Sequence, residues 1–241
     1  MAAGAGAVNP APRAIFFDLD GTILDWTTGM EESWLASCAE HGDGTYTPAQ
    51  LHDAIRVRRT WFWDDPDRAY RGRMDLDGAS REIVRHAFAD LGLDDVERAH
   101  RLADHYRALR TAAIAPYPGA IETLDAIRSR GIAMALITNG EARNQRRSIE
   151  AHALAQYFHC IVNEGEFGVG KPDERVFRHA LAAVGCEPER AWMVGDNLEA
   201  DIETPHGLGM HTVWVDAEGH GLPDGAGIRP HRIVRSITEL V

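Results

Sequence analysis

Two aspartates separated by one residue, Asp18 and Asp20, close an apolar run and are the chain's clearest candidates for chemistry. The run, residues 14–17, is typical of a buried parallel strand, and ligands bind at the carboxyl ends of such strands. Two carboxylates at that end repel each other unless a cation, a shared proton or a positive neighbour compensates. A divalent metal would do so and would prepare the site for phosphate chemistry. The alternative is an ordinary turn in which Asp and Gly supply only turn geometry.

A second polar segment, Thr138 and Asn139 followed by Gly140, comes directly after the apolar run 132–137. A hydroxyl and backbone amides that turn into a helix N-terminus can hold a phosphate. These residue types are also common in ordinary turns, so the segment alone leaves both interpretations open. We take Thr138 and Asn139 as candidate substrate-binding residues.

Lys171 is the single lysine among 25 basic residues. A chain that uses arginine everywhere else keeps a lysine where a compact ammonium is needed, as a point charge on phosphate or carboxylate. The alternative is a lysine that neutralises a generic acidic patch. The next residue, Pro172, suits the first position of a helix, which we expect over 172–184.

A third segment places two more aspartates after a strand-like run that ends at Gly195. Mg²⁺ prefers few protein carboxylates together with waters or substrate oxygens, so Asp196 could complete a metal site with Asp18 and a backbone carbonyl. Asp201, at the start of the next helix, could hold Lys171 or the metal-bound waters in place. Taken alone, this segment is equally compatible with a plain turn.

The elements that must position these residues alternate regularly from residue 115 onward, which predicts an α/β fold with a doubly wound parallel sheet and right-handed crossovers. Residues 13–23 supply the first strand, so the core should comprise 13–23 and 115–241. The expected helices are 120–130, 142–152 and 172–184, and the expected later strands are 132–138, 160–162, 191–194 and 212–215.

Residues 24–114 differ in character and predict an inserted all-helical cap domain. They hold four of the six tryptophans, and the apolar stripe over 83–91 has the period of a helix. The aromatic segment 61–63 could stack on a base or a sugar ring, although such side chains usually form the core of a small domain. Four arginines could meet a substrate carboxylate, although such residues usually form a solvated face: Arg56, Arg58, Arg59 and Arg73.

The bulk composition bounds the partners and the compartment. The net charge of −12 argues against nucleic acid or an anionic membrane as a partner, and no apolar run reaches the length of a membrane helix. Three scattered cysteines are typical of a reduced, cytoplasmic protein. The small residues of 1–12 predict a disordered tail without the features of a signal peptide. The sequence leaves open whether the protein forms a homodimer.

In order and position, these segments resemble the motifs of the haloacid dehalogenase superfamily. The matching residues are 18–22, Thr138, Lys171 and 195–201, and the insert resembles the family's C1-type helical cap. Within the family, the core resembles the branch that contains N-acylneuraminate-9-phosphatases and nucleoside-monophosphate phosphatases.

The resemblance implies a Mg²⁺-dependent phosphomonoesterase for a small phosphorylated metabolite, such as a sugar phosphate, a nucleotide or a phospho-acid. It implies that Asp18 forms an aspartyl-phosphate and that Asp20 acts as general acid and then as general base. Thr138 and Lys171 would hold the phosphoryl oxygens, and the metal ligands would be Asp18, Asp196 and the carbonyl of Asp20. A phosphomutase and a non-catalytic phosphometabolite-binding protein are the alternatives on this fold.

Overall fold

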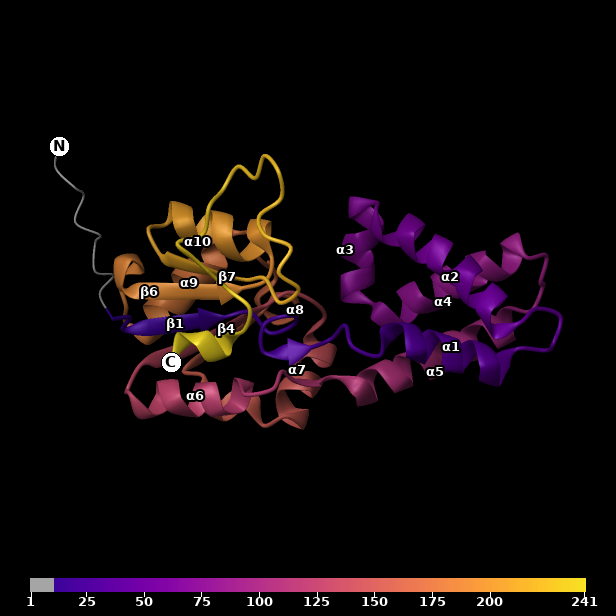
Figure 1. Ribbon diagram of the computed structural model, residues 1–241, viewed down its shortest axis with the longest axis horizontal. Coiled ribbons are helices and arrows are strands. Elements are labelled where there is room, and N and C mark those ends of the chain that lie inside the picture. The colour runs from indigo at the N-terminus through magenta and orange to yellow at the C-terminus, as the bar shows by residue number, and fades with distance from the viewer. Residues whose placement is uncertain (1–10) are drawn as a thin grey trace. The chain divides into compact units, whose positions relative to one another are not determined.

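The computed structural model describes residues 11–241, so most of the predicted tail, 1–12, lies outside the described residues. The described chain forms two compact units. The sheet unit ends at Leu24 and resumes at Pro116, and the helical unit comprises Asp25–Ala115. Two short strands, β2 (Leu24–Asp25) and β3 (Ala115–Pro116), pair where the chain passes between the units (Figure 1).

The sheet unit is built on six parallel strands in the order β5-β4-β1-β6-β7-β8. They are β1 (Ala14–Phe17), β4 (Ala133–Thr138), β5 (Cys160–Asn163), β6 (Ala191–Gly195), β7 (His211–Val215) and β8 (Arg232–Val234). Because β1 lies between β4 and β6, the residues that follow these three strands emerge side by side at one sheet edge. The predicted α/β fold with a parallel sheet is therefore confirmed.

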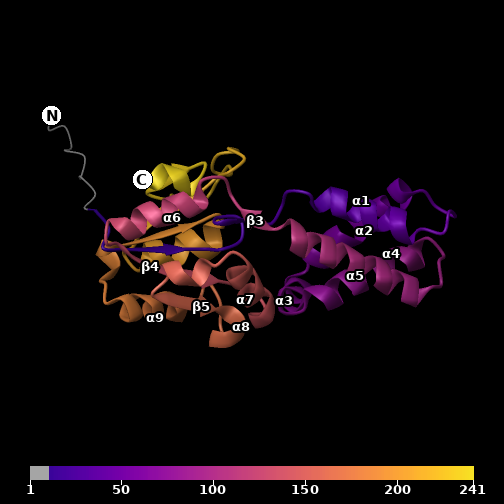
Figure 2. The ribbon, with the colours of Figure 1, turned by 90° about the horizontal axis from the view of Figure 1, so that it is seen from below.

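Helices cover both faces of this sheet. Figures 1 and 2 show α6 (Ala120–Ser129) on one face and α9 (Glu174–Val184) on the other. Successive strand residues point to opposite faces, and Phe16 of β1 packs with Phe177 of α9. The remaining helical segments of this unit are α7 (Ala142–Ala151), α8 (Glu164–Phe167), α10 (Thr204–Gly207), η1 (Leu154–Tyr157), η2 (Pro188–Arg190), the π-helix η3 (Leu198–Glu203) and η4 (Ile237–Leu240).

Two details of the sheet unit differ from the sequence prediction. Helix α9 begins at Glu174, because the carboxylate of Asp173 accepts the backbone N–H of Arg175 at 2.9 Å and caps the helix. The prediction that Pro172 occupies the first helical position was therefore wrong. Strand β8 was not predicted, because it offers only one buried side chain and no apolar run.

The helical unit has its own core. Its helices are α1 (Met30–His41), α2 (Pro48–Trp63), α3 (Pro66–Met74), α4 (Leu76–Asp90) and α5 (Val96–Ala113). Trp34 of α1 stacks on Tyr106 of α5 with ring centroids 3.5 Å apart, and the stripe predicted over 83–91 packs in the same core. In the described part of the chain, no helix is long and apolar enough to span a bilayer.

The three aromatic residues at the end of α2 have different environments. Phe62 is buried in the core with 2% exposure, whereas Trp63 is 39% exposed. Trp61 is partly buried, and the guanidinium of Arg68 lies 4.1 Å from the centre of its ring. Phe62 is thus a core residue, and Trp63 is the most exposed of the three.

Three of the four arginines considered for a substrate carboxylate already have acidic partners inside the helical unit. Their partners are Asp53 for Arg56, Asp90 for Arg58 and Glu31 for Arg59. The fourth, Arg73, lies over the ring of Tyr70 at 5.7 Å. Acidic residues of the same unit therefore already pair with three of the arginines, and of these three only Arg56, whose side chain is 62% exposed, fits the solvated-face interpretation.

We expect Phe62→Ala to lower the free energy of unfolding of the helical unit by about 3–5 kcal/mol, because it opens a cavity in the core. Trp63→Ala removes a half-exposed ring and should cost clearly less. Denaturant titration followed by circular dichroism measures both variants. Equal losses would contradict the assignment of Phe62 to the core.

Candidate functional site

The turn after β1 places Asp18 beside the end of β6. The backbone N–H of Asp18 donates to the carbonyl of Val194 at 2.9 Å, so the ladder between β1 and β6 continues beyond the strand. The carbonyl of Leu19 then accepts the N–H groups of Ile23 and Leu24, both at 2.9 Å. This tight turn fixes the direction in which residues 18–22 leave the sheet.

Two glycines let the carboxylates approach one another. Gly21 has a φ of +84°, and a Cβ there would lie 2.2 Å from Oδ2 of Asp196. At Gly195, a Cβ would lie 2.3 Å from Cγ of Asp201. Glycine is required at both places, since any side chain would push an aspartate away.

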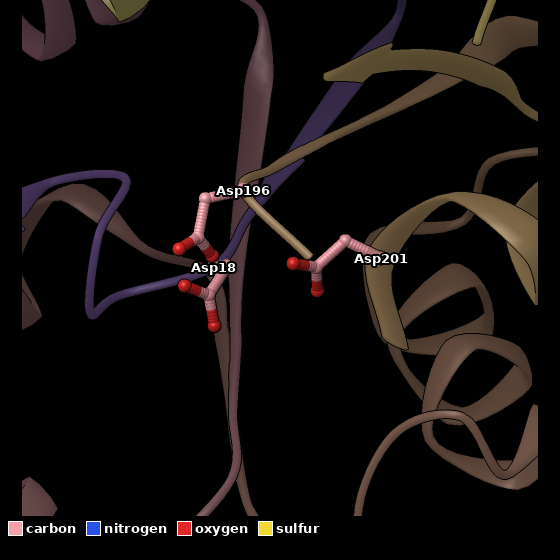
Figure 3. Close-up of side chains that lie close together, drawn as sticks. All are labelled: Asp18, Asp196 and Asp201. Atoms are coloured by element: carbon pink, nitrogen blue, oxygen red, sulfur yellow. The ribbon is translucent and has the colours of Figure 1, made fainter. Parts of the chain in front are cut away.

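Three aspartates, one after β1 and two after β6, converge with one lysine. Carboxylate oxygens of Asp18, Asp196 and Asp201 lie within 4.8 Å of one another, and Figure 3 shows Asp201 reaching toward Asp18 from η3. Nζ of Lys171 donates to Oδ1 of Asp18 and to Oδ1 of Asp201, each at 2.6 Å. Oδ2 of Asp201 accepts the backbone N–H of Asn197 at 3.0 Å. Both oxygens of Asp201 are therefore engaged.

The cluster carries more negative than positive charge. Burial raises the pKa of Asp18 well above its usual range despite the neighbouring ammonium. Burial, together with the charge of Asp201, raises the pKa of Asp196 to about 6. Burial disfavours the ammonium of Lys171, but the charges of Asp18 and Asp201 outweigh it and hold its pKa above the ordinary value. A cation beside Asp18 and Asp196 would neutralise the surplus charge.

The side chain of Asn139 holds the backbone of Lys171. Nδ2 of Asn139 donates to the carbonyl of Lys171 at 2.7 Å, and the N–H of Lys171 donates to Oδ1 of Asn139 at 2.8 Å. The side-chain amide of Asn139 therefore positions Lys171. The predicted contact of Asn139 with substrate is then left to the backbone N–H of Asn139. Thr138, the last residue of β4, is buried at the same sheet edge.

Glu164, which sequence reasoning missed, supports the loop after β4. Its Oε2 accepts the N–H of Gly140 at 2.8 Å, and the N–H of Gly165 donates to the carbonyl of Gly140 at 3.0 Å. Glu164 is 8% exposed and directly follows β5, which pairs with β4. Its position directly after a strand was the available signal, because Asp18, Asn139 and Asp196 occupy such positions.

Gln145 of α7 was also missed. Its Nε2 donates to Oδ2 of Asp20 at 2.9 Å. Burial raises the pKa of Asp20, while this hydrogen bond and the charge of Lys171 partly oppose the shift. The available signal was helical spacing, since Gln145 and Ile149 are one turn apart and are the two buried residues of α7.

The structure thus brings all the predicted residues to one edge of the sheet. Asp18, Lys171, Asp196 and Asp201 form one cluster. Asp20 is joined to the loop after β4 through Gln145, which also donates to the carbonyl of Asn139. Their roles in a reaction stay predictions. The arrangement itself can bind a divalent cation, present an ammonium to an anion and offer two carboxylates for nucleophilic and proton-transfer chemistry.

Comparison with known proteins gives a consistent family. The profile described as "haloacid dehalogenase-like hydrolase" matches residues 12–209. A phosphoserine phosphatase of Thermus thermophilus is 42% identical over 141 residues, which are 58% of this chain and 55% of that protein. The chain therefore spans only about half the length of that relative.

Two more distant relatives match over nearly their whole length. The pyrimidine 5'-nucleotidase YjjG of Escherichia coli is 29% identical, covering 94% of this chain and 95% of that protein. The mouse N-acylneuraminate-9-phosphatase is 27% identical, covering 95% and 92%. Among solved structures, the putative hydrolase YfnB of Bacillus subtilis has a TM-score of 0.72 at 21% identity, covering 95% of this chain and 97% of that one. This last likeness shows the fold.

We expect Lys171→Met to lower the free energy of unfolding by about 3–5 kcal/mol at neutral pH, because it leaves buried carboxylates without their ammonium. Arg175→Met is the matched control, since Arg175 forms an ion pair of the same 2.6 Å length at an exposed position. Water screens that pair, so its loss should hardly change stability. Denaturant titration compares the two variants, and similar losses would contradict a stabilising role of the buried pair.

Proposed function

The chain belongs to the haloacid dehalogenase-like hydrolase family, and we propose that it is a Mg²⁺-dependent phosphomonoesterase acting through an aspartyl-phosphate on Asp18. The observation that carries the proposal is the ammonium of Lys171, held at 2.6 Å from both Asp18 and Asp201 inside an acidic cluster. Relatives named for phosphoserine, pyrimidine nucleotides and N-acylneuraminate 9-phosphate support a small phosphate ester as substrate. Which ester it is depends on groups outside this cluster.

Asp18 is suited to nucleophilic attack because one of its two oxygens is already oriented. Lys171 hydrogen-bonds Oδ1, so Oδ2 is the oxygen that forms the bond to phosphorus while the ester P–O bond breaks. The ammonium lies next to the reacting carboxylate, where it also attracts the phosphoryl oxygens. Thr138 and the backbone N–H of Asn139, at the neighbouring strand end, bind the same phosphoryl group.

Asp20 transfers the protons. It protonates the leaving alkoxide as the P–O bond breaks, and it then takes a proton from the water that attacks phosphorus and releases phosphate from Asp18. Desolvation raises the pKa of Asp20, which favours the protonated carboxyl group that a general acid needs. The two aspartates thus have different tasks, because Lys171 hydrogen-bonds Asp18 and Gln145 hydrogen-bonds Asp20.

The donor set fits Mg²⁺. Carboxylates of Asp18 and Asp196, with the carbonyl of Asp20, are the hard oxygen ligands that this ion prefers, and the surplus negative charge at Asp196 calls for a cation. When bound, Mg²⁺ would neutralise charge between the nucleophile and the phosphoryl group. Asp201 is engaged by Lys171 and Asn197, so we assign it to positioning the lysine.

We assign residues 24–114 as the cap that selects the substrate, with residues 13–23 and 115–241 as the catalytic core. The helical unit has a separate hydrophobic core and carries no residue of the acidic cluster. Trp63 is one of its exposed aromatic side chains, with Trp26 and Tyr70, that could contact a substrate. The three free cysteines favour a reducing compartment, and we place the enzyme in the cytoplasm.

We expect wild-type protein to release inorganic phosphate from a subset of nucleoside monophosphates, sugar phosphates, phosphoserine, phosphoglycolate and N-acylneuraminate 9-phosphate. Asp18→Asn should reduce the rate by about 10³-fold or more, because the amide is a poor nucleophile. Asp125→Asn, the same change at an exposed residue of α6, serves as the control. Near wild-type turnover by Asp18→Asn would exclude Asp18 as nucleophile. An isomeric phosphate ester formed without free phosphate would indicate a mutase instead.

We expect Mg²⁺ to bind at least about 10-fold more weakly at pH 5 than at pH 7.5, because a proton competes at Asp196, whose pKa is about 6. Because the pKa of Asp196 is raised in the folded protein, its ionisation destabilises the metal-free fold as the pH rises from the ordinary aspartate pKa to about 6. Bound Mg²⁺ should restore the lost stability. Isothermal titration calorimetry at both pH values measures binding. Asp196→Asn should weaken it and reduce its pH dependence. Binding unchanged by pH and by this variant would place the metal elsewhere.

A further inference from the structure

We propose that Gln145 is a positioning residue that fixes the proton-transfer group Asp20; this inference rests on the proposed function. Nε2 of Gln145 donates to Oδ2 of Asp20 at 2.9 Å and to the backbone carbonyl of Asn139 at 2.8 Å. Asp20 lies in the turn after β1, and Asn139 lies in the loop after β4. One buried amide therefore joins two segments that carry the chemistry.

The hydrogen-bonding pattern determines the orientation of this amide. An NH₂ group has two N–H donors, and both partners of Gln145 are oxygens that accept. The reversed orientation would place the amide oxygen against a carboxylate and a carbonyl, which repel it. Oδ2 of Asp20 is thus occupied by a donor, and Oδ1 is the oxygen left to exchange a proton with the leaving group or with water.

The backbone position of Gln145 is fixed by a capped helix. It lies in the first turn of α7, whose N-terminus is capped by Glu141 through the N–H groups of Arg143 and Asn144, both at 2.8 Å. Its side chain is buried, and a Cβ on Gly140 would lie 2.9 Å from Nε2. The absence of a side chain at Gly140 therefore makes room for the amide.

Gln145 also completes a chain of hydrogen bonds through the site. It connects Asp20 to Asn139, the side chain of Asn139 holds the backbone of Lys171, and Lys171 donates to Asp18. The two carboxylates of the reaction are therefore positioned relative to each other through side chains as well as through the turn between them. Loss of the central amide should leave Asp18 and Lys171 in place and release Asp20.

Leaving-group dependence separates this role from a structural one. Phenolate is a poor leaving group and needs the proton of Asp20, whereas 2,4-dinitrophenolate leaves without one. The ratio kcat/KM reports steps up to the first irreversible one, which here is phosphorylation of Asp18. A variant with a misplaced Asp20 should therefore lose kcat/KM selectively on phenyl phosphate.

The experiment measures kcat and KM of Gln145→Leu on phenyl phosphate and on 2,4-dinitrophenyl phosphate, with Asp20→Asn as the reference. We expect kcat/KM of Gln145→Leu to fall about 10–100-fold on phenyl phosphate and to stay within about 3-fold on the dinitrophenyl ester, with the loss in kcat. Arg147→Leu, the same new residue at an exposed position of α7, is the matched control. Gln145→Met replaces Gln145→Leu if the latter does not fold.

Three results would overturn the inference. Equal losses on both esters would show that Gln145 only maintains the structure. If Asp20→Asn loses kcat/KM selectively on phenyl phosphate while Gln145→Leu loses none on either ester, Asp20 needs no positioning by Gln145. The proposed function would then still hold. Equal losses for Asp20→Asn itself would remove Asp20 as the acid, so the proposed function would fail and the inference with it.

Discussion

The ammonium of Lys171, shared at 2.6 Å between Asp18 and Asp201, is the interaction on which the rest of the site depends. A buried ammonium is costly unless acceptors surround it, and buried carboxylates are costly without a cation. Neither side of the pair is stable without the other. Other hydrogen bonds fix Lys171 and Asp201 in place, because Asn139 holds the backbone of Lys171 and the backbone N–H of Asn197 donates to Asp201. The carboxylate of Asp18 is thereby held in one orientation by the protein itself.

The parallel sheet makes this arrangement possible with little chain. Strands β1, β4 and β6 are neighbours, so the short loops that follow them bring Asp18, Asn139 and Asp196 to one edge without long excursions. The strands are buried and rigid, and residues just beyond their ends share that rigidity. Glycines at 21 and 195 then remove the atoms that would keep the carboxylates apart. The same strand order and glycine positions therefore set both the packing of the sheet and the electrostatics of the site.

The helical unit is stabilised separately from the site. Its core and three arginine ion pairs are internal, so its stability does not draw on the acidic cluster. Such independence fits a family in which one phosphate-handling core is combined with different substrates, and the relatives named here range from an amino-acid phosphate to a nucleotide. If the helical unit is the cap, as proposed, the chemistry and the choice of substrate can change separately.

Sequence patterns alone predicted the fold class and most of the candidate site. Apolar runs that end in aspartate, threonine or glycine mark the strand ends, and these signals are local in the chain. The hydrogen-bond partners of these residues became visible only in the folded chain. Lys171 meets Asp18 across 153 residues and Gln145 meets Asp20 across 125, and the amide of Asn139 turns to the backbone of Lys171. Local patterns do not encode which strands become neighbours, and that order decides which side chains can touch.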